Sequence, residues 1–99
     1  MSEVEETLNR MQTHKNVQGI VVVNAEGSVI RTTYQNEKKE EGNNLARLIP
    51  KLVHNARSTV RDLDTQNELK FIRLKTIKNE ILIAPDNEFI LIMVQGQRN

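Results

Sequence analysis

The sequence predicts an α/β (α+β) sandwich of three layers, in which a five-stranded, mostly antiparallel sheet carries a helix on each face. Two observations predict this fold. Residues 17–23 and 89–94 are mostly apolar, which is typical of strands covered on both faces. An apolar stripe at helical spacing runs from Leu45 to Leu63, about five turns of one long helix. At 99 residues the chain is one domain, residues 1–99, close to the size at which a partner helps to bury a core.

The predicted elements follow in the order α-β-β-α-β-β-β. The first is an amphipathic helix over residues 2–15, in which Ser2 and Glu5 form a capping-box pattern. Its narrow apolar face consists of Val4, Leu8 and Met11. A stripe of this width covers a sheet and does not fill a core alone.

A hairpin follows this helix. The strand at 17–23 leads into a turn at 24–27, where Gly27 supplies the permissive backbone. The returning strand at 28–34 loses its apolar character after Ile30, as is usual at a sheet edge. Residues 35–44 contain no core-forming side chain, so we expect an exposed, mobile loop.

The long helix is expected to begin at Asn43 or Asn44, either of which can cap it. Pro50 predicts either a kink or a helix that becomes regular only near residue 49. The polar face of the helix is basic, and its weak candidates for partner contact are Lys51, His54, Arg57 and Arg61. A solvated face is the simplest interpretation, an acidic protein partner is the next, and nucleic acid is disfavoured because aromatic residues are few.

Three strands complete the chain, at 69–77, 81–84 and 89–94. The first of them carries Lys70, Arg73 and Lys75, which protect an edge from indiscriminate pairing. Such an edge can still pair with its own copy about a two-fold axis. The two apolar strands belong at the centre and the second and third strands at the edges, so the predicted order is 2-1-5-4-3.

Composition and motifs exclude most chemistry. The chain has no cysteine, which removes disulfides and thiolate sites, and its net charge of +1 gives no argument for nucleic acid or a membrane. No apolar run reaches the length of a membrane span, and the acidic start is unlike a signal peptide, so we expect a cytosolic protein. His14 and His54 lack ligand spacing, and the glycines form no phosphate loop. We therefore expect no enzyme, cofactor or metal site.

Several segments closely resemble the roadblock-type dynein light chains. They are ARSTVRDLD at 56–64, QNEL at 66–69, FIRL at 71–74, KNEI at 78–81 and APD at 84–86, together with VQGIVVVN at 17–24 and Glu26-Gly27 in the first hairpin. These motifs are typical of the dynein branch and cover nearly the whole chain. The departures are concentrated in residues 35–51, where the loop is more charged and Pro50 falls within the helix.

The resemblance implies a non-catalytic subunit that dimerises through its long helix and third strand, with itself or a roadblock paralogue, and binds dynein intermediate chains. Through them it would join the heavy-chain complex on microtubules in the cytoplasm or in the ciliary axoneme. The dimer surface that the resemblance implies consists of Leu48, Leu52, Ala56, Val60, Lys70, Ile72, Leu74 and Thr76. The alternatives are a scaffold or regulator of a small GTPase, with Arg57 or Arg61 acting in trans, and a homodimeric scaffold with neither partner.

Overall fold

The computed structural model describes residues 6, 10 and 16–96. The helix expected over residues 2–15 lies outside the described residues except for Glu6 and Arg10, which are helical. A helix on the second face of the sheet therefore stays a prediction. In the described part of the chain, no helix combines the length and the apolar character that a membrane span needs.

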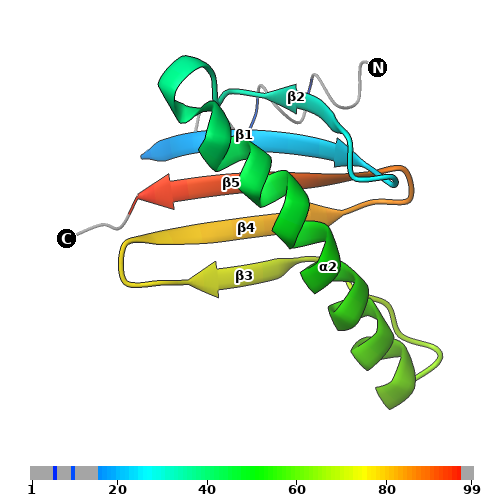
Figure 1. The fold of residues 1–99 in the computed structure, drawn as a ribbon. Coiled ribbons are helices and arrows are strands. Elements are labelled where there is room, and N and C mark those ends of the chain that lie inside the picture. Colours follow the sequence, from blue (N-terminus) through cyan, green and yellow to red (C-terminus); the bar gives the residue numbers. More distant parts are fainter. Residues whose placement is uncertain (1–5, 7–9, 11–15, 97–99) are drawn as a thin grey trace.

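The sheet has five strands in the order β2-β1-β5-β4-β3, and every neighbouring pair is antiparallel (Figure 1). The strands are β1 Val17–Asn24, β2 Val29–Thr32, β3 Ile72–Lys75, β4 Asn79–Pro85 and β5 Phe89–Gly96. The predicted order is confirmed. The central pair, β1 and β5, is apolar on both faces: Val21, Val23 and Ile92 lie in the larger core cluster, whereas Val22 and Leu91 are buried in a second cluster.

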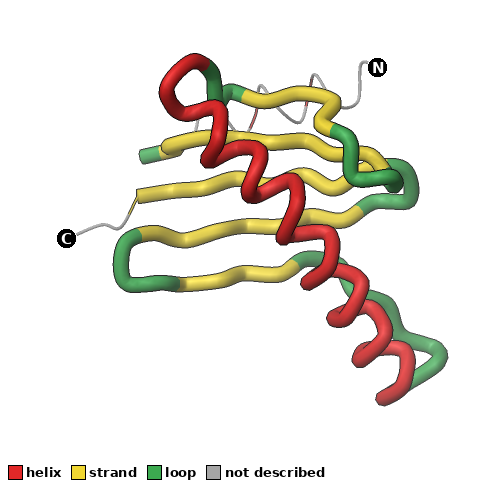
Figure 2. The backbone as a smooth tube through the Cα atoms, in the orientation of Figure 1, coloured by secondary structure: helices red, strands yellow, loops and turns green. Residues whose placement is uncertain are grey.

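One long helix, α2 Lys39–Leu63, covers a face of the sheet and follows a short 3₁₀ turn, η1 Asn36–Lys38 (Figure 2). Its buried residues Ala46, Ile49 and Val53 belong to the larger core cluster. The expected loop at 35–44 and the helix start at Asn43 or Asn44 are therefore wrong.

The early start of α2 depends on a backbone contact at Gly42, which involves no apolar side chain of the helix. Gly42 is buried, and a Cβ placed on it would lie 2.8 Å from Tyr34 Cβ. The Tyr34 side chain also lies against Gly19 of β1. Because Gly19 and Gly42 have no Cβ, the Tyr34 ring fits between β1 and the first turns of α2. The helix backbone at Gly42 therefore packs against the core although residues 35–44 contain no core-forming side chain.

Pro50 lies inside α2, and the helix is unbroken there, so the expectation of a helix that becomes regular only near residue 49 is wrong. Proline has no N–H, and a proline in a helix interior costs about 3 kcal/mol. Ile49 and Val53, on either side, are both buried. We attribute the continuity of the helix to this tertiary packing.

The third strand is shorter than the expected 69–77, because only Ile72–Lys75 pair with β4. Continuing the register by two pairs would oppose Phe71 with Ala84 and Lys70 with Pro85, where β4 ends. Lys70, Phe71 and Thr76 therefore lie beside the strand in sequence but outside its ladder.

Candidate functional site

The outer edge of β3 is open. The turn bond from Thr76 N–H to the Asn79 carbonyl, 2.8 Å, fixes which residues bond to β4. Along an antiparallel pair the bonded residues alternate, so Ile72 and Leu74 bond inward and the backbone groups of Phe71, Arg73 and Lys75 face outward. In the residues that the structure describes, no strand lies beyond β3. This edge presents a template for another strand.

Apolar side chains lie exposed around this edge. Figure 1 shows α2 crossing the sheet diagonally and extending past β3, so that its last turns overhang the edge. Leu63 at the end of α2 is 82% exposed, Phe71 before β3 is 61% exposed, and Ile77 in the β3–β4 turn is 95% exposed. Phe71 and Ile77 flank the two ends of β3, and exposed apolar side chains beside an open edge are typical of an association surface.

The flank of α2 that faces β4 carries an open hollow. Leu48 is 50% exposed and lines a hollow of about 370 Å³ with Leu45, Ile81 and Val94. The hollow, the outward edge of β3 and the exposed residues Leu48, Leu63, Phe71 and Ile77 are together called the edge surface below.

Of the eight residues predicted for a dimer, Leu48 is among the named residues of the edge surface, and Ile72 and Leu74 lie in its strand, β3. Leu52, Ala56, Val60, Ile72 and Leu74 are half-buried, whereas Leu48, Lys70 and Thr76 are exposed. Lys70 and Thr76 fall outside the β3 ladder, so their predicted place within the strand is wrong. The role of all eight residues in a dimer stays a prediction.

Charges along the edge are partly paired within the chain. Arg73 Nε donates to Glu80 Oε2 on β4, and Lys70 Nζ lies 3.5 Å from Glu68 Oε1. Both groups of the Lys70–Glu68 pair are largely exposed, so this pair adds little stability. The Arg73–Glu80 pair instead reduces the charge that an approaching strand would meet.

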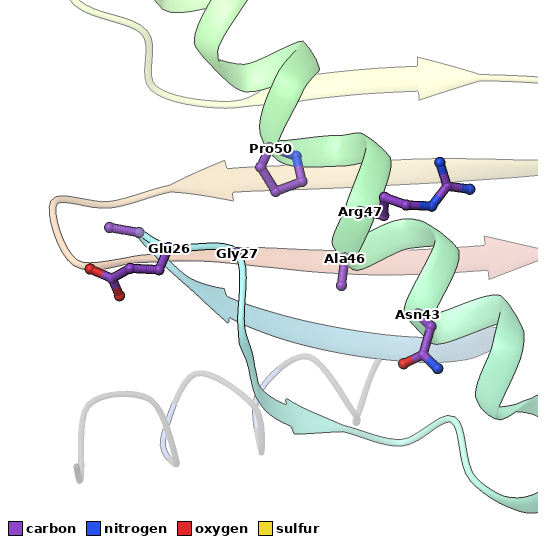
Figure 3. Close-up of a pocket in the computed structure, with 7 residues that line it drawn as sticks. Glu26, Gly27, Asn43, Ala46, Arg47 and Pro50 are labelled. Atoms are coloured by element: carbon purple, nitrogen blue, oxygen red, sulfur yellow. The ribbon is translucent and has the colours of Figure 1, made fainter.

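A second surface lies on the opposite flank of α2, where the helix faces the β1–β2 and β4–β5 turns. A cavity of about 400 Å³ is lined by Ala25, Glu26 and Gly27 of the first turn and by helix residues including Asn43, Ala46, Arg47 and Pro50 (Figure 3). A cavity of about 180 Å³ continues it, and Ala25 and Pro50 line both. The two cavities together are called the turn groove below.

Local chemistry fixes both turns that form the groove. Asn24 Oδ1 accepts hydrogen bonds from the N–H groups of Glu26, 3.0 Å, and Ser28, 2.9 Å, and Gly27 adopts a φ of 87°. Arg57 Nη2 donates to the Asp86 carbonyl oxygen, 3.1 Å, which ties the β4–β5 turn to α2. The groove walls are therefore held in place before any partner arrives.

The structure divides the four basic residues predicted to meet a partner. All four are exposed, but only His54 and Arg57 line the turn groove; Lys51 and Arg61 do not. Arg47 lines the larger cavity and was absent from the predicted site. Its spacing of seven from His54 places it on the same flank, a signal that the helical pattern contains.

Two observations concern the chemical groups of the described residues. Across the described residues, no group of three or more His, Cys, Asp or Glu side chains is arranged to hold a metal ion. Burial, and to a lesser degree the charge of Glu41, raises the pKa of the Tyr34 phenol. Tyr34 is thus a neutral packing element between Gly19 and Gly42.

Comparison with known proteins gives one family. The model of the Roadblock/LC7 domain matches residues 3–96. A Roadblock/LC7 domain from Streptomyces avermitilis has a similar structure, with a TM-score of 0.77 and 12% identity over 90% of this chain and 73% of its own. MglB from Myxococcus xanthus gives 0.74 and 18% identity over 100% and 80%. An MglB with a tetrameric arrangement gives 0.76 and 11% identity over 96% and 71%. These structural similarities support the fold.

Proposed function

The chain belongs to the Roadblock/LC7 domain family, and we propose that it is a non-catalytic scaffold that acts as a dimer. One observation carries this proposal: the edge surface places an open strand edge beside exposed apolar side chains of α2. A second copy can cover both at once, because a two-fold axis presents the same surface from each partner. An MglB with a tetrameric arrangement is consistent with self-association in this fold.

The charges on β3 favour one register for this dimer. If Arg73 lay on the two-fold axis, it would face Arg73 of the second copy. If Leu74 lay on the axis, Arg73 would face Lys75 of the second copy, which is again a pair of like charges. Ile72 on the axis instead sets Arg73 against the exposed ring of Phe71, and a cation over an aromatic face is attracted to it. We therefore place Ile72 on the two-fold axis of the dimer.

The partner we propose is the dynein intermediate chain, on the support of the sequence motifs typical of the dynein branch at 56–64, 66–69 and 78–81. A dimer offers two equivalent sites and can hold two intermediate chains together. The second binding event then benefits from the effective concentration set by the first. In this function the chain supplies geometry on microtubules, in the cytoplasm or the axoneme, while ATP hydrolysis stays on the heavy chain.

A scaffold or regulator of a small GTPase is the second candidate, and the comparisons favour it at least as well. Two of the similar structures named above are MglB proteins, and none of the three is a dynein subunit. Roadblock-fold proteins outside the dynein branch serve small GTPases. Arg57 already donates to the Asp86 carbonyl, so a trans-acting arginine at that position would first have to break this bond, whereas Arg61 at the end of α2 is exposed.

Affinity capture of the tagged chain from its native cells under mild salt, with mass spectrometry of the recovered proteins, separates the two candidates. Recovery of dynein intermediate and heavy chains supports the motor subunit, and the heavy-chain type distinguishes the cytoplasm from the axoneme. Recovery of a small GTPase without dynein would overturn the intermediate-chain proposal and favour the second candidate.

A further inference from the structure

The turn groove lies on the flank of α2 that faces away from the hollow of the edge surface. Pro50 and His54 line the groove, whereas Leu48 and Leu52 belong to the opposite flank, about half a helical turn away. A dimer formed through the edge surface therefore leaves both grooves open. This inference deepens the proposed function, on which it rests, by assigning a surface to the partner.

Pro50 gives the groove a backbone acceptor. Because proline has no N–H, the Ala46 carbonyl cannot accept the bond that residue 50 supplies in an ordinary helix. Ala46 and Pro50 both line the larger cavity, and Ala46 is only 6% exposed (Figure 3). The bond that residue 50 would supply to the Ala46 carbonyl is missing, so an N–H group from a bound segment is favoured at this acceptor.

The helix wall of the groove is basic. Arg47 lines the larger cavity, and His54 and Arg57 line the smaller one. Arg57 is held at the groove by its bond to the Asp86 carbonyl and uses one of its several N–H groups for it. A guanidinium group held in place in this way suits a carboxylate.

The turn wall carries the opposite charge. Glu26 lines the larger cavity, and Asp86 and Glu88 line the smaller one. A segment with carboxylates on both sides would meet repulsion there, so the groove selects acidic side chains that point only toward α2.

We propose that the turn groove binds an extended segment of a protein partner, with a backbone N–H on the Ala46 carbonyl and carboxylates toward Arg47 and Arg57. The floor between these groups consists of the small or apolar residues Ala25, Pro50 and Val53. Main-chain bonding gives affinity, and the charged wall gives direction.

The test measures binding of two probes to the full chain by fluorescence anisotropy. One probe is the recombinant N-terminal region of a dynein intermediate chain from the source organism. The other is a twelve-residue test peptide of alternating leucine and glutamate. Arg47→Glu is expected to weaken both by about tenfold, because it replaces a charge-assisted hydrogen bond by repulsion. Lys78→Glu, in the exposed β3–β4 turn, is the matched charge control and should bind as the wild type does.

Pro50→Ala gives a sharper readout because two properties move in opposite directions. It restores the helix N–H for the Ala46 carbonyl, so the melting temperature should rise while affinity for both probes falls several-fold. Thr59→Ala, an exposed change on α2 outside the groove, controls for helix propensity and should leave affinity unchanged.

The outcomes separate this proposal from the proposed function. Binding of the intermediate chain that survives both Arg47→Glu and Pro50→Ala would overturn the groove and leave the motor subunit standing. Binding of the peptide alone, lost in both variants, would support the groove and overturn the dynein partner. A wild-type chain that binds neither probe would overturn the groove itself.

Discussion

The packing of Tyr34 between two glycines gives a quantitative prediction for Gly19→Ala. A Cβ at position 19 would lie 2.1 Å from Tyr34 Cζ, so the ring must leave its place. The ring is now buried, with 6% of the residue exposed. Overpacking costs about 1–3 kcal/mol, and expelling an aromatic side chain that buries about 150 Å² forfeits about 4 kcal/mol at 25 cal/mol per Å². We expect a loss of about 3 kcal/mol of unfolding free energy.

Urea unfolding at one fixed protein concentration measures this loss, because dimerisation makes stability depend on concentration. Gly96→Ala is the matched control: its Cβ would lie 3.1 Å from Gln18 Nε2, the end of a flexible side chain, and should cost little. In the double variant Gly19→Ala with Tyr34→Ala, the methyl group fills space that the ring vacates. The double variant should therefore lose less unfolding free energy than the two single variants lose together. A Gly19→Ala chain as stable as the wild type, or strictly additive costs, would refute this account of the packing.

The remaining predictions concern pH, the second glycine and the dimer. Because the pKa of Tyr34 is raised in the fold above its ordinary value of 10.0, the stabilisation is complete below pH 10 and is lost as pH rises through the folded pKa; Tyr34→Phe should reduce this alkaline loss in unfolding scans at pH 8 to 11. Gly42→Ala should lower the unfolding free energy by about 1–3 kcal/mol in urea, because its Cβ would lie 2.8 Å from Tyr34 Cβ; an unchanged midpoint would contradict the contact. Val60→Asp, on the overhanging part of α2, should convert the dimer to monomer in light scattering while circular dichroism stays unchanged, and a persistent dimer would exclude this part of the helix from the interface.

The sequence was sufficient for the strand order. Strands apolar on both faces, 17–23 and 89–94, belong at the centre, and the charges of Arg73 and Lys75 mark an edge. The start of α2 was missed for a physical reason. Gly42 makes its core contact through the backbone, which leaves no apolar side chain for a periodicity argument to find.

The candidate site was predictable only in part. The basic face of α2 follows from helical spacing, but a groove needs two walls. The second wall comes from Glu26 and Glu88, which lie 62 positions apart in the sequence and approach the same helix only in the folded chain. Similarly, the apolar pattern of residues 69–77 does not give the length of β3: its ladder with β4 contains only Ile72–Lys75 and is followed by the turn bond from Thr76 to Asn79.

Cysteine cross-linking tests the dimer most directly, because the native chain contains no cysteine. Three single variants each test a different register, because each places its thiol on the two-fold axis in that register alone: Ile72→Cys, Arg73→Cys and Leu74→Cys. Opposed residues of an antiparallel pair have Cα atoms about 4.5–5.5 Å apart, which a disulfide spans. Ser28→Cys, in the distant β1–β2 turn, is the control.

Mild oxidation should convert Ile72→Cys to a covalent dimer while the other variants stay largely uncoupled. Rapid coupling of Leu74→Cys instead would leave the dimer standing and contradict the register. A wild-type chain that is monomeric in light scattering, with no variant coupling faster than Ser28→Cys, would contradict the proposed dimeric scaffold.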